Sequence, residues 1–398
     1  MNRTLFAISI AARLPHGLFS IAVLVHVASV TDSFAVAGAC TGVLAVAQAM
    51  GGPLAGRMVD RYGQAPVLVT TTGACAAALV AMAVTPGGAS AGWLLAWSAV
   101  IGAGAPPVGA CFRALVPTLV PTQTGQRSAY AADAAATEIT WVAGPLLTFT
   151  VAGLFFPAAA LVLAAVVLTV AVTGFAASTA SRAWQPSTAP RQRGGALRSV
   201  GLRVLVVVLV GVGVLFGATE VAVTATTEAW GSPGSAGPLL GLWGLGSLCG
   251  GVAAARFGGG ARTGRGLAAM LVALGLGHAS LAAATDDVLL MGLLIAAAGS
   301  MIAPILATAY AMVDAIVPAG TTTEAFTWLA TATAVGTAMG AALAGNLAET
   351  SGATWGFGLA GLAAVTSAAL AATRLGAPRA IAALGATPVP VVPVGYDA

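Results

Sequence analysis

The stretch GRMVDRYG at residues 56–63 places three charged side chains, Arg57, Asp60 and Arg61, between two long apolar runs. Only 7% of the 398 residues are charged, whereas 58% are hydrophobic and the mean hydropathy is +0.95. Soluble domains usually have about 25% charged and about 45 to 50% apolar residues. The composition therefore predicts an all-α integral membrane protein. Because charged residues are rare in this chain, we expect those in this loop to have a function.

Apolar runs divide the chain into predicted membrane spans, because a helix needs about 20 mostly apolar residues to cross a hydrocarbon core of about 30 Å. Twelve spans are predicted, near 5–30, 33–56, 67–85, 91–117, 128–152, 156–178, 203–226, 236–255, 267–284, 288–313, 324–348 and 352–373. They form an N-terminal half (1–178), a polar cytoplasmic linker (179–202) and a C-terminal half (203–373). A Pro-rich tail (374–398) is predicted to be disordered.

The basic residues predict the orientation. All 16 are Arg, and those outside the predicted spans fall in alternate loops only. Cytoplasmic loops collect such residues, so both termini are predicted to be cytoplasmic in a multi-pass protein of the inner (plasma) membrane. Trp93, Trp230 and Trp355 then fall at the outer boundary, where aromatic belts occur.

Several classes of binding are disfavoured by the sequence. The Arg residues are not clustered on one solvated surface, which argues against a nucleic-acid partner. The four Cys lie in apolar segments without CxxC spacing, so neither a disulfide framework nor a metal site is expected. We expect no cofactor, and a monomer whose partners are the bilayer, protons and a small-molecule substrate.

Internal repetition relates the two halves. GRMVDRYG (56–63) recurs as GVAAARFG (251–258), with Ala255 in the place of Asp60. APPVGACFRALVP (105–117) parallels IAPILATAYAMVD (302–314), and SAYAADAA (128–135) parallels EAFTWLAT (324–331), all at offsets of 195 to 197 residues. A duplicated six-helix unit is the architecture of many secondary transporters.

The loop that joins the second and third spans resembles the G-x-x-x-D-R-x-G-R-R signature of the major facilitator superfamily. The match is carried by Gly56, Asp60, Arg61 and Gly63, whereas Gln64 and Ala65 replace the usual basic residues. The resemblance implies twelve helices in two pseudo-symmetric halves, and a cytoplasmic gate in which the Asp sits near the start of the eleventh helix and the Arg is held in a charge network.

The predicted start of the eleventh span fits that gate. TTTE (321–324) has capping-box spacing, with Thr321 as the expected N-cap, and the positive helix terminus would attract Asp60. We also assign Arg113 to this gate. The alternative is that Arg57, Asp60 and Arg61 are loop charges that only fix the topology.

Two further family signatures are partial. Gly144 and Pro145 resemble the core of the drug and metabolite antiporter motif, but its flanking glycines are missing. Gly102 fits a fourth-span signature in which Ser98 replaces the usual Arg. Both departures weaken, without removing, the resemblance to the exporting branch.

Charged residues at membrane depth are candidates for function because their burial is costly. Glu138 lies about 15 Å in from Ser128 and Arg13 about 12 Å in from Leu5, at 1.5 Å per residue. We assign both to a central substrate cavity. Burial disfavours the charged form of a carboxylate, so Glu138 is the predicted proton-coupling residue.

Asp133 lies about 140° around the helix from Glu138, so the two carboxylates cannot share a face. Asp133 is the second candidate for proton coupling, and Arg113 is its expected partner. The alternative is a purely structural pair between neighbouring helices. Arg13 could instead neutralise Glu138, and the sequence leaves that choice open.

Other side chains complete the predicted sites. His16 lies on the face of Arg13, as a cavity residue or a buried hydrogen-bonded one, and Glu220 is either an outer gate or plain surface. Possible cavity contacts, which are more often packing residues, are Trp141, Trp243 and Trp328.

These features favour a proton-coupled exporter of a small amphipathic drug or secondary metabolite that works by alternating access. The alternative within the fold is a proton-coupled uptake symporter. The sequence carries no HExxH, GxSxG or Walker motif, so an enzyme is not expected. A non-transporting scaffold or sensor is the alternative of another class.

Overall fold

The computed structural model describes residues 3–186, 195–261 and 263–375, and the regular secondary structure of these residues is entirely helical. The first part of the chain forms seven helices: α1 (Arg3–Thr31), α2 (Phe34–Tyr62), α3 (Gln64–Ala83), α4 (Ala91–Ala103), α5 (Val108–Leu119), α6 (Gln123–Leu154) and α7 (Pro157–Ala176). The linker predicted at 179–202 begins with the short α8 (Thr179–Ala183) and ends with the turn η1 (Ala196–Arg198). Its middle lies outside the described residues, as does almost all of the predicted tail.

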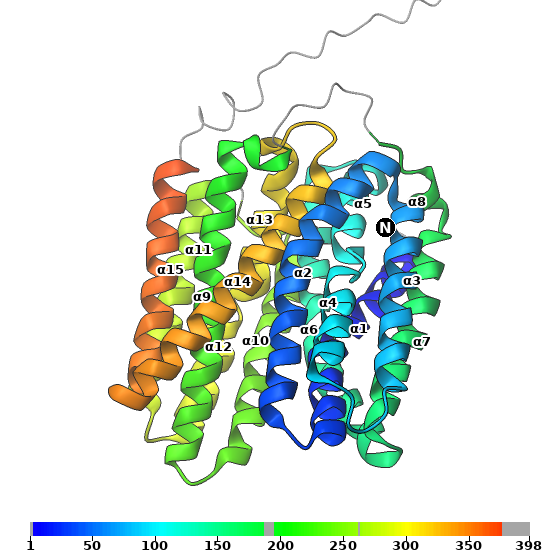
Figure 1. Ribbon diagram of the computed structural model, residues 1–398. Coiled ribbons are helices and arrows are strands. Elements are labelled where there is room, and N and C mark those ends of the chain that lie inside the picture. The colour runs from blue at the N-terminus through cyan, green and yellow to red at the C-terminus, as the bar shows by residue number, and fades with distance from the viewer. Residues whose placement is uncertain (1–2, 187–194, 262, 376–398) are drawn as a thin grey trace, which may run out of the picture.

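The second part of the chain repeats the long helices. Its elements are α9 (Val200–Ala229), η2 (Pro233–Ser235), α10 (Ala236–Arg256), α11 (Gly264–Ser280), η3 (Leu281–Ala284), α12 (Val288–Gly299), α13 (Ile302–Ile316), α14 (Thr322–Thr350) and α15 (Thr354–Arg374). The described helices stand side by side in one bundle, with α2 and α14 next to each other at its centre (Figure 1).

Eleven helical stretches of the described residues are long and apolar enough to cross a membrane, and two of them are the pairs α4–α5 and α12–α13. The helix α6 has 32 residues and packs against α1, α10 and α13, but it is not among the eleven. Its hydropathy is lowered by polar and charged side chains such as Arg127, Asp133 and Glu138. The all-helical membrane fold is therefore confirmed, while twelve spans remain a prediction.

The fourth and tenth predicted spans are each broken, which the hydropathy pattern did not indicate. The first break falls between Ala103 and Val108, where Pro106 and Pro107 lack the N–H that would continue the helix. The second falls at Ser300 and Met301, and Pro304 lies in the first turn of α13. Both breaks occupy matching places in the sequence repeat. The glycines that end its first motif also match, with φ of 94° at Gly63 and 88° at Gly258.

Helices within each part of the chain approach closely through glycine. A Cβ atom on Gly17 of α1 would collide with the carbonyl of Thr140 on α6, and one on Gly144 would collide with Gly17. In the second part, a Cβ on Gly213 of α9 would collide with the carbonyl of Thr333 on α14. These contacts join α1 to α6 and α9 to α14 by backbone against backbone.

The bundle has two ends. We call the latch end the one that holds the start of α1, the α2–α3 junction at Gly63 and the start of α14; it is uppermost in Figure 1. Apart from Arg13 and Arg113, the described Arg residues lie near helix ends on this side. Trp93, Trp230 and Trp355 lie at the opposite, far end. Which side of the membrane the latch end faces remains a prediction.

Candidate functional site

Asp60, near the end of α2, caps the start of α14. The Asp60 side chain is buried, its Oδ1 accepts a hydrogen bond from the Thr323 N–H at 3.1 Å, and its Oδ2 accepts one from the Glu324 N–H at 2.8 Å. The first N–H groups of a helix have no partner within that helix and carry partial positive charge. Asp60 thus satisfies two of them across the boundary between the two parts of the chain.

Gly56 allows this contact because α2 and α14 nearly touch there. A Cβ atom at Gly56 would lie 2.9 Å from the Cα of Glu324 and 2.6 Å from the Oγ1 of Thr327. Gly63 follows one turn beyond Asp60, with φ of 94°, and its N–H donates to the Val59 carbonyl at 2.9 Å. Gly63 therefore ends α2 directly after the residues that contact α14.

Thr321 is the N-cap residue of α14, as predicted, but the predicted capping box does not form. Thr321 precedes α14 with φ of −130° and ψ of 17°, and its side chain makes no capping hydrogen bond. Its hydroxyl instead donates to the Pro318 carbonyl at 2.8 Å. The side-chain cap that the sequence pattern assigned to Thr321 is provided instead by Asp60 of α2.

The ion pair beside this cap is made by Arg57, not by Arg61 as the family resemblance implied. Arg57 Nη2 lies 2.7 Å from Glu324 Oε1, and the side chains are 57% and 2% exposed respectively. Arg61 is exposed, with its guanidinium 5.1 Å from the centre of the Tyr62 ring, and makes no ion pair within the described ranges. The sequence pattern predicts Glu324 only as a capping-box residue.

A further hydrogen bond joins the two parts of the chain at the latch end. The Tyr130 hydroxyl of α6 donates to Asp314 Oδ2 of α13 at 2.9 Å. The Tyr130 ring packs 6.1 Å from Phe326 and 6.5 Å from Tyr310. Tyr130 is buried and Asp314 is exposed, and neither residue is assigned a role from the sequence.

Three buried charges meet deeper in the bundle. Asp133 of α6 lies between Arg13 of α1 and Arg113 of α5: its Oδ1 is 2.7 Å from Arg13 Nη1 and its Oδ2 is 2.7 Å from Arg113 Nε. The Asp133 side chain is fully buried and both Arg side chains are less than 10% exposed. The predicted pairing of Asp133 with Arg113 is confirmed, so Arg113, also assigned from sequence to the gate, belongs to this charged cluster. Arg13 pairs with Asp133 and not with Glu138.

Glu138 points to a different neighbour. It is partly buried, and its Oε1 accepts a hydrogen bond at 2.8 Å from the hydroxyl of Ser247 on α10. Within the described parts of the chain, no Arg forms an ion pair with it. Ser247, a hydroxyl in an apolar span, was not singled out from the sequence.

The aromatic residues proposed for the cavity differ in their surroundings. Trp243 is buried, and its Nε1 donates to His278 Nε2 at 3.0 Å, so His278 carries its proton on Nδ1, which lies 2.8 Å from the Leu274 carbonyl. Trp243 is therefore a packing residue between α10 and α11. Trp328 is partly buried, while Trp141 is 59% exposed.

The remaining candidates make few polar contacts. His16 is partly buried, and its ring lies 5.3 Å from that of Phe19. Glu220 is exposed on α9, and its backbone carbonyl accepts a bond from Thr224 at 2.8 Å. The described residues hold no group of three His, Cys, Asp or Glu side chains that could bind a metal.

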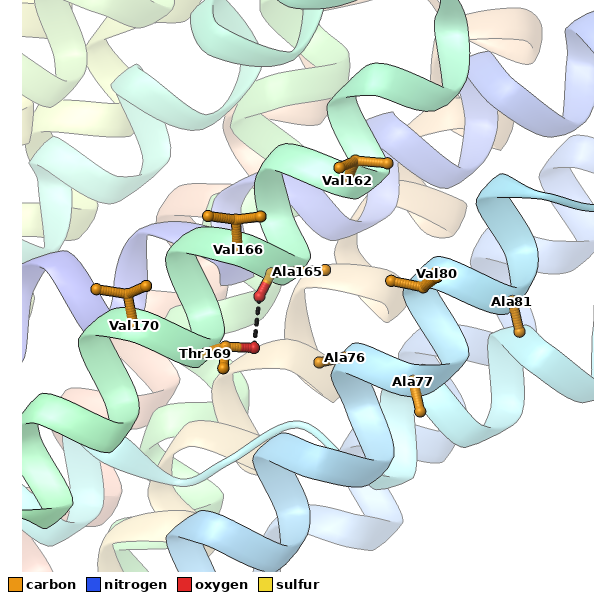
Figure 2. A pocket seen from close by; sticks show the side chains of 9 residues that line it. All are labelled: Ala76, Ala77, Val80, Ala81, Val162, Ala165, Val166, Thr169 and Val170. Atoms are coloured by element: carbon orange, nitrogen blue, oxygen red, sulfur yellow. Dashed lines mark hydrogen bonds between the residues drawn. The ribbon is translucent and has the colours of Figure 1, made fainter.

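A groove of about 660 Å³ lies on the outside of the bundle between α3 and α7. Figure 2 shows that its lining is Ala and Val apart from Thr169, whose hydroxyl donates to the Ala165 carbonyl at 2.7 Å. The only hydroxyl in the groove already donates a hydrogen bond and the other lining residues are apolar, so the groove has no polar group free to bind a ligand. None of the charged residues described above lines it.

The helical bundle, with charged residues buried between its helices, defines an integral membrane protein of the secondary-transporter architecture. Residues 5–265 match the model of the Major Facilitator Superfamily, and the chain belongs to that family. It is accordingly a membrane transporter, a class that is generally not enzymatic. No curated protein matches the sequence.

Solved structures share the fold at low sequence identity. A bacterial homologue of the iron transporter ferroportin, in an outward-facing state, superposes with a TM-score of 0.74 at 14% identity, over 93% of this chain and 98% of that one. The human organic anion transporter MFSD10 (TETRAN) gives 0.70 at 18% identity, over 93% and 99%. The proton:xylose symporter XylE gives 0.70 at 14%, over 92% and 94%. At these identities the likeness concerns the fold alone.

Proposed function

We propose that this transporter exports a small amphipathic compound in exchange for protons, by alternating access between its N-terminal and C-terminal halves. The observation that carries the proposal is Glu138. Its carboxylate is bonded to a hydroxyl of α10, with no ion pair among the described residues to hold it charged. A partly buried carboxyl group without a cation can take up and release a proton as its surroundings change.

The contacts at the latch end support alternating access. Asp60 and Arg57 on α2 both bind α14, and Tyr130 on α6 binds α13. In this proposal these contacts close the cytoplasmic side and must break before the substrate site opens there. Protonation of Glu138, whose bond to Ser247 also crosses the halves, changes the balance between the two states.

The proposed setting follows from the Arg residues that gather at the latch end. We propose that this end faces the cytoplasm, with both termini on that side of the inner (plasma) membrane, because cytoplasmic loops collect basic residues. We also propose that the protein works as a monomer, since each monomer contains both halves of the proposed transport path.

The test is proton flux in proteoliposomes that contain the purified protein and a pH-sensitive dye. A panel of amphipathic compounds is added on one side, and exchange predicts that each transported compound moves protons in the opposite direction. Glu138→Gln should abolish this flux while the protein remains folded and binds the same compounds. Glu349→Gln, an exposed residue at the end of α14, is the matched control and should retain it.

Other outcomes would replace the proposal. Movement of protons in the same direction as the compound would make the protein the uptake symporter considered as the alternative. Full proton-linked flux in Glu138→Gln would exclude that residue as the coupling site, and Asp133→Asn would be tested next. Absence of compound-dependent flux across the whole panel would favour a scaffold or sensor.

A further inference from the structure

The buried charged cluster of Arg13, Arg113 and Asp133 carries one more positive than negative charge. Asp133 is the shared partner, and each of its oxygens is already 2.7 Å from one guanidinium. An excess charge inside a membrane protein is costly unless another group neutralises it. The cluster is therefore short of one anion.

The two Arg side chains differ in how many of their guanidinium N–H donors make hydrogen bonds. Every nitrogen of the Arg13 guanidinium has a partner: Nε donates to the Ser9 carbonyl at 2.9 Å, Nη2 to the Ser9 hydroxyl at 3.2 Å, and Nη1 reaches Thr137 at 3.4 Å as well as Asp133. Arg113 uses only Nε. Its Nη1 and Nη2 make no hydrogen bond with any residue that the structure describes.

Two neighbouring residues, Tyr310 and Gly109, lie against the Arg113 guanidinium without using these donors. The Tyr310 ring covers one face of the Arg113 guanidinium, with the Cζ atom 3.9 Å from the ring centre, which leaves the edge with both Nη groups available. Gly109, one turn earlier on α5, has no side chain there: a Cβ atom would lie 3.7 Å from Nη1 and 3.8 Å from Nη2. The Arg113 side chain is buried, with 8% exposure, so an anion bound there would be largely shielded from water.

The nearby acidic groups are bound elsewhere. Glu138 accepts a hydrogen bond from Ser247, and Asp314 accepts one from Tyr130. Neither forms an ion pair with Arg113 in the described ranges of the chain. The missing anion is thus not supplied by the side chains that the structure shows around the cluster.

We propose that Arg113 binds the carboxylate of the transported molecule, which makes the substrate an organic acid with an apolar body. Two parallel N–H groups of a guanidinium match the two oxygens of a carboxylate, and the pairing is stronger when it is shielded from water. This inference rests on the proposed transport function and names the substrate class of that same site. Arg13 holds Asp133, which in turn positions Arg113.

The experiment measures binding without any proton gradient. The full-length protein in lipid nanodiscs is heated with benzoate, 2-naphthoate or decanoate, and in parallel with the amide of each acid. The parent protein should be stabilised by at least one acid and much less by its amide. Arg113→Gln should weaken binding of that acid by about tenfold or more, as expected for the loss of a charged hydrogen bond of about 1.5 to 3 kcal/mol.

Two variants make the result specific. Arg61→Gln removes an exposed Arg outside the cluster and should bind the acid as the parent does. Arg113→Lys keeps the charge beside Asp133 but lacks the planar fork, so it should fold and still bind the acid several-fold more weakly than the parent. If Arg113→Gln does not fold, the affinity of Arg113→Lys for the acid tests the proposal in its place.

The inference is overturned if acid and amide stabilise the parent equally, if none of the three acids stabilises it, or if the Arg113 variants bind the acid unchanged. If the parent protein binds none of the acids but retains proton-linked flux of other compounds, only the substrate class is refuted. Acid binding together with flux that survives Glu138→Gln would refute only the proposed coupling.

Discussion

The starts of α6 and α14 occupy matching places in the sequence repeat but are capped in different ways. At α6, the Thr122 side chain accepts the Gly125 N–H at 3.2 Å, so the helix caps itself. At α14, Thr321 makes no such bond, and Asp60 of α2 accepts two N–H groups instead. The position equivalent to Asp60 in the second motif is Ala255, which has no group to offer α6.

The difference shows how a duplicated fold can gain a breakable contact. A helix capped by its own residue keeps the cap in any arrangement of the two halves. A helix capped from the opposite half loses its cap when the halves separate, so its two N–H groups then need water or another partner. Of these two helices, only α14 has a cap that depends on whether the two halves are in contact.

The largest effect is expected for Asp60→Asn. In the parent protein each carboxylate oxygen accepts one helix N–H. The asparagine side chain has a single oxygen, so it can accept only one of these bonds, and its NH₂ group then faces the other N–H. Loss of a charged acceptor costs about 1.5 to 3 kcal/mol, so we expect the closed latch to become about tenfold or more less populated. Labelling of a cysteine at the buried Thr327 should rise in proportion, in a Cys249→Ser background because Cys249 is exposed.

Thr122→Ala is the matched control for that variant. It removes the self-made cap of α6 and should cost about 1 kcal/mol of stability. Labelling at Thr327→Cys should nevertheless stay at the parent value. Equal labelling of Asp60→Asn and the parent would show that the α14 cap does not hold the latch end closed.

A smaller effect is expected for Arg57→Gln. Glu324 is buried and loses its ion-pair partner, but the Arg57 side chain is more than half exposed and solvent weakens the pair. We expect a few-fold increase in the same labelling. High salt weakens the ion pair in the parent protein, so the difference in labelling between parent and variant should become smaller. Arg61→Gln removes the same charge four residues away and should change nothing; an equal effect of both variants would mean that the loop acts through its net charge alone.

The smallest effect is expected for Ala255→Asp. The new carboxylate would lie near a helix start whose cap Thr122 already provides, so the change in stability should stay within about 0.5 kcal/mol. Labelling at Thr327→Cys should not fall below that of the parent. A clear fall would mean that the second motif can still be turned into a latch, and that the present asymmetry is only the loss of one side chain.

The fold, the contact of Asp60 with α14 and the pairing of Asp133 with Arg113 could be predicted because they depend on residue type. Long apolar runs indicate spans wherever they occur, and the resemblance around Asp60 pointed to the start of α14. The choice between Arg57 and Arg61 depends on where two helices cross. They cross at Gly56, so Arg57 lies at the crossing and Arg61 lies one turn beyond it.

The partners of the buried charges could be predicted only in part. The helical period correctly separated Asp133 from Glu138, which contact different helices. The period of one helix does not reveal which neighbour each face meets, so Arg13 was left without a definite partner and Ser247 was missed. His278 received no role because nothing in its own segment indicates Trp243, 35 residues earlier.

The glycine contacts between α1 and α6 and between α9 and α14 have a consequence for the mutational tolerance of the chain. Every single-nucleotide missense change of a glycine codon introduces at least a Cβ atom, so Gly17, Gly144 and Gly213 have no conservative replacement. Gly153, Gly345 and Gly358 have nothing within 4 Å of such an atom and can accept alanine without a clash. The places where two backbones touch therefore limit the heritable variation that this membrane protein can carry.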